Sequence, residues 1–253
     1  MNTYFMTDTG QVRSHNEDAG GVFINAHKQV LVVIADGMGG HKAGDVASKM
    51  AITSLSEKWQ KSEELLLPED TEVWLKDSIS EINQNLFNYA QEHEDCMGMG
   101  TTIVAAICTS EYITIAHIGD SRCYLQNNQG FQQITEDHSL VNELVRSGQI
   151  SKDDAEHHPR KNVLLKALGT EQHVEADVRS IGWEKDDLLL LCSDGLSNKI
   201  NDEELSEKVK SPSNLEDVAN QFISLANERG GEDNISIALV HYDGLDTAEE
   251  GVS

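Results

Sequence analysis

The sequence predicts an α+β fold, a four-layer αββα sandwich in which two sheets pack face to face and helices cover both outer surfaces. Two observations lead to this prediction. Many strand-like segments, such as QVLVVIA and YITIAHI, are apolar on both faces, which is typical of strands that are covered on both sides. Other segments carry one apolar stripe at helical spacing, and such helices must pack against another element. Two stacked sheets with outer helices satisfy both requirements.

Short apolar runs bounded by turn residues predict the strands. They are residues 3–8, 19–25, 28–35, 101–109, 112–118, 122–127, 131–134, 174–180, 187–193 and 234–241. Three longer helices are expected between these strands. One begins at Ala43, one follows Pro68, and one follows Asn214, whose side chain is suited to cap a helix N-terminus.

The stretch 137–170 differs in character from the rest of the chain. It is expected to form two short helices and a polar loop around His157 and His158, as an excursion over the surface. No Pro/Gly/Ser-rich linker and no internal repeat divides the sequence. Residues 1–243 are therefore expected to form a single domain, followed by a solvated tail over residues 244–253.

Composition and charge argue against several function classes. The chain of 253 residues has 19 Lys and Arg against 44 Asp and Glu, a net charge of −25, which disfavours nucleic acid and membrane surfaces as partners. The four cysteines have no CxxC spacing, which favours buried, reduced thiols over disulfides or a zinc site. The N-terminus lacks signal-peptide features and no apolar run approaches membrane-spanning length. We therefore expect a soluble, cytoplasmic protein.

The stretch VVIADGMGGHKAGDVASK, residues 32–49, has an apolar run before Asp36 and then four glycines within eight residues. It does not match a nucleotide-binding loop. A dinucleotide fingerprint requires glycine where Lys42 stands, and a P-loop requires Lys and Ser or Thr after Gly44. The carboxylate of Asp36, held at the end of a buried strand, is therefore the more informative feature.

Acidic residues recur at the ends of the predicted strands. They are Glu17, Asp18, Asp36, Asp120, Asp194 and Asp233. For any one of them, ordinary turn chemistry is about as good an explanation, because Asp before Gly or Ser is common after a strand. For five strand ends in one chain, convergence at one edge of the sandwich is the better explanation.

Converging carboxylates would repel one another in a partly dry cleft unless cations neutralised them. Oxygen ligands without Cys or His favour Mg²⁺ or Mn²⁺ over Zn²⁺ or copper. An EF-hand is excluded, because its calcium loop pattern does not occur. Without a Cβ at Gly37, the chain can turn sharply and a backbone carbonyl can approach a metal. The sequence thus predicts a metal site around Asp36.

Eight segments resemble a known family in the order in which that family has them. They are TDTGQVRSHNED, VVIADGMGGHKAGDVAS, MGTTIVAAI, IAHIGDSRCYL, ITEDHSLV, ALGT, LLLLCSDGLSNKI and GGEDNISIALV. Together they span roughly residues 7 to 241. The chain resembles the protein phosphatase 2C group of metal-dependent serine/threonine phosphatases, in its compact bacterial form. The resemblance implies that the two sheets are mostly antiparallel.

The resemblance also implies roles for the matched residues. Asp36 bridges two metal ions, Asp194 and Asp233 complete the first site, and the Gly37 carbonyl serves the second together with the pair Glu17 and Asp18. Asp120 shares a weaker third ion with Asp194. Arg13 binds the substrate phosphate, for which a planar, two-pronged guanidinium is suited.

The general acid is open. Animal members often carry a histidine where this chain has Met38, and methionine cannot give up a proton. His41, three residues on, is a candidate catalytic substitute. Two alternatives stay open: His41 is a histidine at a helix start with no such role, or metal-bound water protonates the leaving group.

The implied reaction is hydrolysis of phosphoserine or phosphothreonine on proteins by metal-activated water, with Mn²⁺ or Mg²⁺ as cofactor, in two core ions and a possible third. The expected partners are phosphorylated protein substrates, including a bacterial Ser/Thr kinase, and the chain is expected to be a monomer. Three alternatives remain: an inactive relative that binds phosphoproteins, a nuclease, and a narrow-specificity phosphatase of a sigma-factor regulator.

By the same resemblance, residues 137–170 form a flap beside the site. The flap carries a group of cations, namely Arg146, Lys152, Arg160, Lys161 and Lys166. These side chains are either a solvated face or contacts for a phosphorylated partner. On the second hypothesis, replacing Arg160 and Lys161 weakens hydrolysis of protein substrates more than that of a small aryl phosphate.

Overall fold

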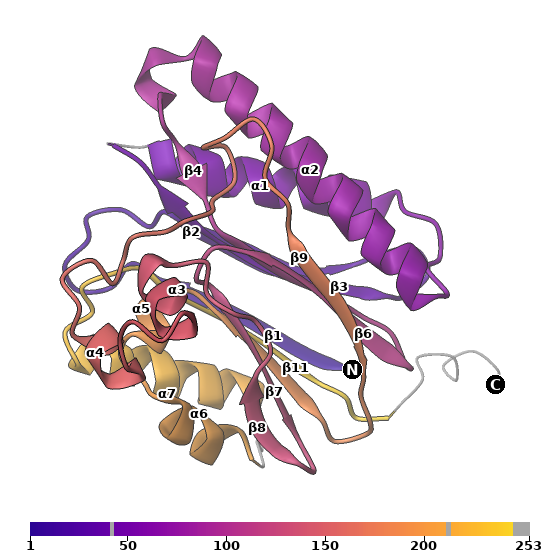
Figure 1. Ribbon diagram of the computed structural model, residues 1–253. Coiled ribbons are helices and arrows are strands. Elements are labelled where there is room, and N and C mark those ends of the chain that lie inside the picture. Colours follow the sequence, from indigo (N-terminus) through magenta and orange to yellow (C-terminus); the bar gives the residue numbers. More distant parts are fainter. Residues whose placement is uncertain (41–42, 211–213, 245–253) are drawn as a thin grey trace, which may run out of the picture.

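The computed structural model describes residues 1–40, 43–210 and 214–244. Over these ranges two antiparallel sheets pack face to face (Figure 1). The first has the strand order β1 (Asn2–Asp8), β11 (Ile235–His241), β10 (Leu188–Cys192), β7 (Arg122–Asn127) and β8 (Gly130–Gln133). The second has the order β2 (Asp18–Ile24), β3 (Val30–Met38), β5 (Ile103–Cys108), β6 (Tyr112–Ile118) and β9 (Asp177–Gly182), with β4 (Gly100–Thr101) paired to β3.

Helices cover the outer face of each sheet, as Figure 1 shows. The second sheet is covered by α1 (Ala43–Gln60) and α2 (Pro68–Glu92), which are followed by the short η1 (Glu94–Cys96). The first sheet is covered by α5 (Asp194–Ser197), α6 (Asp202–Val209) and α7 (Leu215–Glu228). This arrangement confirms the predicted αββα sandwich.

Alternation along the central strands explains why they are apolar on both faces. In β3, Val32 and Ile34 pack between the two sheets, whereas Leu31 and Val33 pack against α1 and α2. All four side chains are fully buried. Each such burial stabilises the fold by about 1.5–3 kcal/mol. The strand therefore needs apolar residues at every position, not at alternate ones.

The predicted elements differ from the observed ones at three places. The segment predicted as a strand over 174–180 joins the ladder only at Asp177, because Val174 and Ala176 pack against the core without strand pairing. The strand expected over 101–109 is interrupted at Thr102, which lies between β4 and β5. The helices α5 and α6 were not predicted. Asn201 caps α6 in a capping box with Glu204. This pair of residues in the sequence could have predicted the start of α6.

Residues 137–170 contain the two short helices that were predicted, α3 (Leu140–Arg146) and α4 (Lys152–Glu156). This segment, called the flap below, is tied to the sandwich at its start. There Asp137 forms an ion pair with Arg122 of β7, with 2.7 Å between Oδ2 and Nη2. The bridge between Thr101 and Leu168 ties its other end to β4.

The four cysteines are buried, as predicted. None of the helices in the described ranges is both long and apolar enough to cross a membrane. The single domain over residues 1–243 stays a prediction. Of the predicted tail over 244–253, only Gly244 lies within the described residues.

Candidate metal centre

Asp18 and Asp36 lie side by side at the end of the second sheet. Asp18 begins β2 and pairs directly with Asp36 near the end of β3, so the two side chains share one face. Burial is the main cause that raises the pKa of Asp18 to about 7. Burial also raises the pKa of Asp36 well above its ordinary value, and the neighbouring carboxylates raise it further.

Three more carboxylates reach this position from other elements. Asp120 follows β6, Asp194 follows β10 and begins α5, and Asp233 precedes β11. Burial and the charge of Asp194 raise the pKa of Asp120 to about 7. Burial and the charge of Asp233 raise the pKa of Asp194. We call Asp18, Asp36, Asp120, Asp194 and Asp233 the acidic centre, in which both sheets contribute residues.

Two oxygens of the acidic centre are buried and have no hydrogen-bond partner among the described residues: Asp18 Oδ1 and Asp194 Oδ1. The other oxygen of Asp18 accepts hydrogen bonds from the hydroxyls of Ser193 and Ser236, both at 2.7 Å. The other oxygen of Asp194 accepts from the Asn198 amide at 3.0 Å. An unpaired buried carboxylate oxygen is costly, and a bound cation would remove that cost. The residues present therefore fit an oxygen-coordinated divalent ion.

The backbone at Asp36 is fixed by its neighbours. Its N–H donates to the Thr102 hydroxyl at 2.9 Å, and its carbonyl accepts from Thr102 N–H at 2.8 Å. The Thr102 hydroxyl also lies 2.8 Å from that of Ser121, the residue after Asp120. One hydroxyl pair thus links the ends of β3 and β6.

Gly37 must be a glycine because other backbone segments lie against it. A Cβ at this position would come within 2.1 Å of the Gly44 carbonyl oxygen and 2.7 Å of the Glu17 carbonyl oxygen. Its N–H donates to that same Glu17 oxygen at 3.1 Å. The close approach brings Glu17 and the start of α1 to the acidic centre.

Arg13 and Glu17 lie at the margin of the acidic centre. The Arg13 guanidinium is 2.8 Å from Asp233 Oδ2, and its side chain is 48% exposed. Burial raises the pKa of Glu17, while the positive charge of Arg13 lowers it. An exposed guanidinium next to the acidic centre can reach a bound anion.

Sequence reasoning missed the polar side chains that support the acidic centre. Asn234 donates to the carbonyls of Thr9 and His15 and accepts from Glu17 N–H at 2.8 Å, so it holds the loop that carries Arg13. Ser193 and Ser236 hold Asp18. Ser193 and Asn234 adjoin a predicted ligand in sequence, which is the signal that could have found them.

The candidate general acid His41 lies outside the described residues. Met38, at the position where animal members of the family often carry a histidine, ends β3. No described contact bears on the identity of the general acid.

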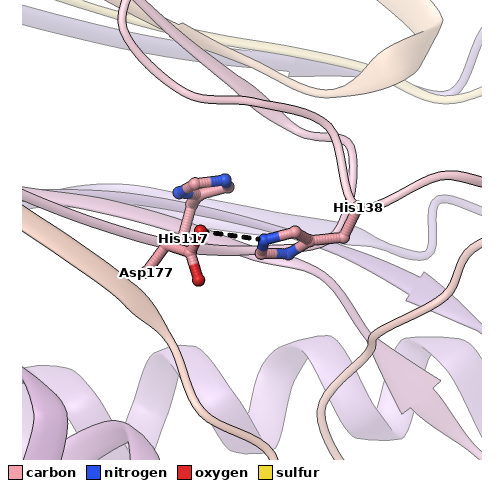
Figure 2. A group of neighbouring side chains, drawn as sticks. All are labelled: His117, His138 and Asp177. Carbon is pink, nitrogen blue, oxygen red and sulfur yellow. Dashed lines mark ion pairs between the residues drawn. The ribbon is translucent and has the colours of Figure 1, made fainter. Parts of the chain in front are cut away.

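A second group of ligand-type side chains lies apart from the predicted set. His117, His138 and Asp177 bring one such atom each within 4.8 Å of one another (Figure 2). His138 Nε2 is 3.3 Å from Asp177 Oδ2, and the two imidazole rings stack with their centroids 4.7 Å apart and their planes at 10°. The sequence analysis did not single out these residues.

In this second group, His138 Nε2 is buried and has no hydrogen-bond partner of good geometry among the described residues, although Asp177 Oδ2 lies 3.3 Å away. Gly119 N–H donates to His138 Nδ1 at 3.1 Å, so the proton of the neutral ring is on Nε2, toward Asp177. His117 Nε2 donates to the Glu136 carbonyl at 2.8 Å. A metal bound to His138 Nε2 would require the proton of the ring to be on Nδ1. That proton would point at the Gly119 N–H and break its hydrogen bond. The tautomer set by the Gly119 N–H therefore disfavours a metal at His138, and the group joins β6, the flap and β9.

The fold and the acidic centre define a class of protein. Clustered carboxylates that offer only oxygen ligands suit hard divalent cations, and paired cations of this kind serve in metal-dependent hydrolases, phosphatases among them.

Comparison with known proteins makes the class specific. Residues 9–238 match the family model for protein phosphatase 2C. The chain is 52% identical to the serine/threonine phosphatase stp of Listeria innocua over 240 residues, which is 95% of each protein. It superposes on the crystal structure of the serine/threonine phosphatase Stp1 from Staphylococcus aureus with a TM-score of 0.89, at 42% identity, covering 94% of this chain and 93% of that one.

A third relative is the catalytic domain of the serine/threonine protein phosphatase PstP, whose crystal structure holds two manganese ions. It has a TM-score of 0.81 and 32% identity, and the match covers 94% of this chain and 96% of that one. The chain belongs to the protein phosphatase 2C family, and it is a protein phosphatase.

Proposed function

We propose that this protein hydrolyses phosphoserine and phosphothreonine esters on other proteins, with two divalent ions, Mn²⁺ or Mg²⁺, held in the acidic centre. One observation carries the proposal: carboxylates from five separate strand ends meet there, and two of their buried oxygens have no partner. The two manganese ions in the PstP structure support the number of core ions.

The proposed ligands are those that the family resemblance implies, and their position supports them. Asp36 would contact both ions, and the four other carboxylates around it all raise its pKa. Asp194 and Asp233 would hold the first ion. Asp18, Glu17 and the Gly37 carbonyl would serve the second. Asp120, whose pKa responds mainly to burial and Asp194, would share a weaker third ion with that residue.

Bound divalent ions supply Lewis acidity, which makes hydroxide available at neutral pH and offsets charge on the phosphoryl oxygens. The chain supplies position and charge. Ser193 and Ser236 orient Asp18, and Thr102 orients the backbone of Asp36. Arg13 exchanges its contact with Asp233 for two hydrogen bonds to the substrate phosphate, which its exposed, planar guanidinium permits.

A cysteine nucleophile has no place in this reaction. Burial raises the pKa of Cys192, the cysteine nearest to Asp194 in sequence, to about 12. Its thiol therefore stays protonated at neutral pH and is a poor nucleophile. The catalytic role of His41 stays a prediction.

The proposal extends to the partners. The substrates would be phosphorylated proteins, including a Ser/Thr kinase, and the protein would act as a cytoplasmic monomer. The relatives named as serine/threonine phosphatases support the substrate class. The net charge of −25 disfavours nucleic acid as substrate.

The test compares purified protein with and without Mn²⁺ on a phosphothreonine peptide, p-nitrophenyl phosphate and plasmid DNA. We expect phosphate release from the first two that requires Mn²⁺ and stops with EDTA, and no cleavage of the plasmid. Binding of phosphopeptide without hydrolysis would identify an inactive relative, and plasmid cleavage would identify a nuclease.

A further inference from the structure

An open cleft of about 1010 Å³ extends from the acidic centre between the flap and the helices α5 and α6. Asp120 and Asp194 lie in its lining. Both residues also belong to the acidic centre, so the cleft adjoins the proposed metal centre. Residues of the flap helices α3 and α4 and of α5 and α6 all line the cleft. The volume is at the upper end of the range of small-molecule pockets, which is enough for a short peptide segment.

One wall of the cleft is negative. Asp202, Glu203 and Glu204 of α6 line it. Glu204 is neutralised by Arg229, with 2.6 Å between Oε1 and Nη2. Asp202 and Glu203 are exposed and form no ion pair with any described residue. Acidic side chains in the first turn of a helix also interact favourably with the helix dipole and can stabilise the helix. The experiment must therefore separate this structural role from substrate binding.

The facing wall is positive. Arg146, Lys152 and Lys161 of the flap line it. Arg146 is paired with Glu143 at 2.6 Å, whereas Lys152 and Lys161 have no ion pair within the described ranges. Of the other flap cations, Lys166 pairs with Asp177, and Arg160 is not in the lining. The lining also holds Lys199, which is paired with Glu232, and the exposed Glu136, directly before the flap. The unpaired charges are therefore acidic on the α6 side and mainly basic on the flap side.

We propose that this cleft binds the substrate polypeptide on one side of the phosphorylated residue. Asp202 and Glu203 select Lys or Arg side chains, and Lys152 and Lys161 select Asp or Glu side chains. Successive side chains of an extended peptide point to opposite sides, so one segment of mixed charge satisfies both walls. This inference rests on the proposed phosphatase function and adds a substrate preference to it.

The test uses phosphothreonine peptides that differ only in flanking residues, which are Lys, Ala or Glu, placed on either side of the phosphothreonine. In the variant Asp202→Asn with Glu203→Gln, the ratio of kcat/KM for the Lys peptide to that for the Ala peptide should fall by about fivefold, because two partly exposed ion pairs are lost. The control variant, Glu207→Gln with Asp217→Asn, removes two exposed acids from α6 and α7 that do not line the cleft, and should leave this ratio unchanged.

The flap provides the converse variant. Lys152→Gln with Lys161→Gln should lower the ratio of kcat/KM for the Glu peptide to that for the Ala peptide by a similar factor. If the variant Asp202→Asn with Glu203→Gln loses kcat/KM equally on all three peptides and on p-nitrophenyl phosphate, the acids of α6 only stabilise the helix. That result would overturn the proposal. Active enzyme whose peptide ratios do not change would also overturn it, with the proposed function intact. No Mn²⁺-dependent hydrolysis of any substrate would instead refute the proposed function.

Discussion

At the scale of single residues, Asp36 determines the behaviour of the acidic centre. It is paired with Asp18 in the β2–β3 ladder, and Asp18, Asp194, Asp120 and Asp233 all raise its pKa. Without a cation, its ionised form is disfavoured by burial and by repulsion at once. The residue that we propose to lie between the two ions is therefore also expected to destabilise the metal-free protein.

Asp36→Asn should abolish Mn²⁺-dependent hydrolysis of p-nitrophenyl phosphate and raise the melting temperature of the metal-free protein. Removing one charge relieves the repulsion in the acidic centre. Activity assays and thermal melts in EDTA measure the two effects. The exposed Asp77→Asn on α2 is the control and should change neither. Retained activity would argue against the two-metal assignment. A lower melting temperature would argue against charge repulsion in the acidic centre of the metal-free protein.

The metal-free protein should lose stability as the pH rises from 6.5 to 8. The folded-state pKa of Asp18 and of Asp120 is about 7, above the ordinary value of 3.8, so the folded state binds more protons than the unfolded state. The free energy of unfolding therefore falls with rising pH until both groups are ionised.

An opposing effect fades across this pH window. Burial lowers the pKa of His117 and His138, so their contribution to stability rises with pH and levels off about one pH unit above the ordinary histidine pKa of 6.5. The fall in stability should therefore be clearest in the upper part of the window. Thermal melts in EDTA at several pH values measure the slope, and Asp18→Asn should make it shallower. A melting temperature that rises between pH 6.5 and 8 would contradict the assignment of these shifts.

Arg13→Ala should lower kcat/KM for phosphorylated substrates by about 10- to 100-fold, because hydrogen bonds from a charged group to the phosphate are lost. Arg13→Lys should recover only part of this loss, since an ammonium cannot form the two parallel hydrogen bonds. The side chain is 48% exposed, so the melting temperature should hardly change. Steady-state kinetics on a phosphopeptide measure the effect. Full activity of Arg13→Ala would remove this residue from phosphate binding.

At the scale of elements, the junction of β3 and α1 positions Gly37 and Glu17, which we propose as ligands of the second ion. Gly37→Ala should destabilise the protein by about 1–3 kcal/mol, because a Cβ would overlap the Gly44 and Glu17 carbonyls. Denaturant unfolding measures the change. Gly40→Ala is the matched control, since nothing lies within 4 Å of a Cβ there. Equal stability of the two variants would contradict this packing.

The elements show which patterns the sequence carries. Strands buried on both faces, such as β3 and β10, have nearly continuous apolar runs, and α7 has a capping residue at Asn214. These could be predicted. The helix α6 buries only Leu205 and Val209, so its apolar pattern is too short to stand out. Val174 and Ala176 look like strand residues because they are partly buried, although they pair with no strand.

At the scale of the whole molecule, the acidic centre could be predicted because its residues share one local pattern, a carboxylate at a strand end. Its supporting contacts could not. Ser236 lies 218 residues from Asp18 in sequence, and Asn234 lies 217 from Glu17. The group formed by His117, His138 and Asp177 likewise depends on how β6, the flap and β9 pack. Such contacts between distant segments leave no local pattern.

The central claim is that carboxylates from both sheets hold divalent ions at one end of the sandwich. Anomalous diffraction from a crystal of the wild-type protein grown with Mn²⁺ tests it most directly. We predict two manganese peaks in the acidic centre, with the Asp36 carboxylate between them. Manganese beside His117, His138 and Asp177 with none in the acidic centre, or no manganese at either position, would contradict it.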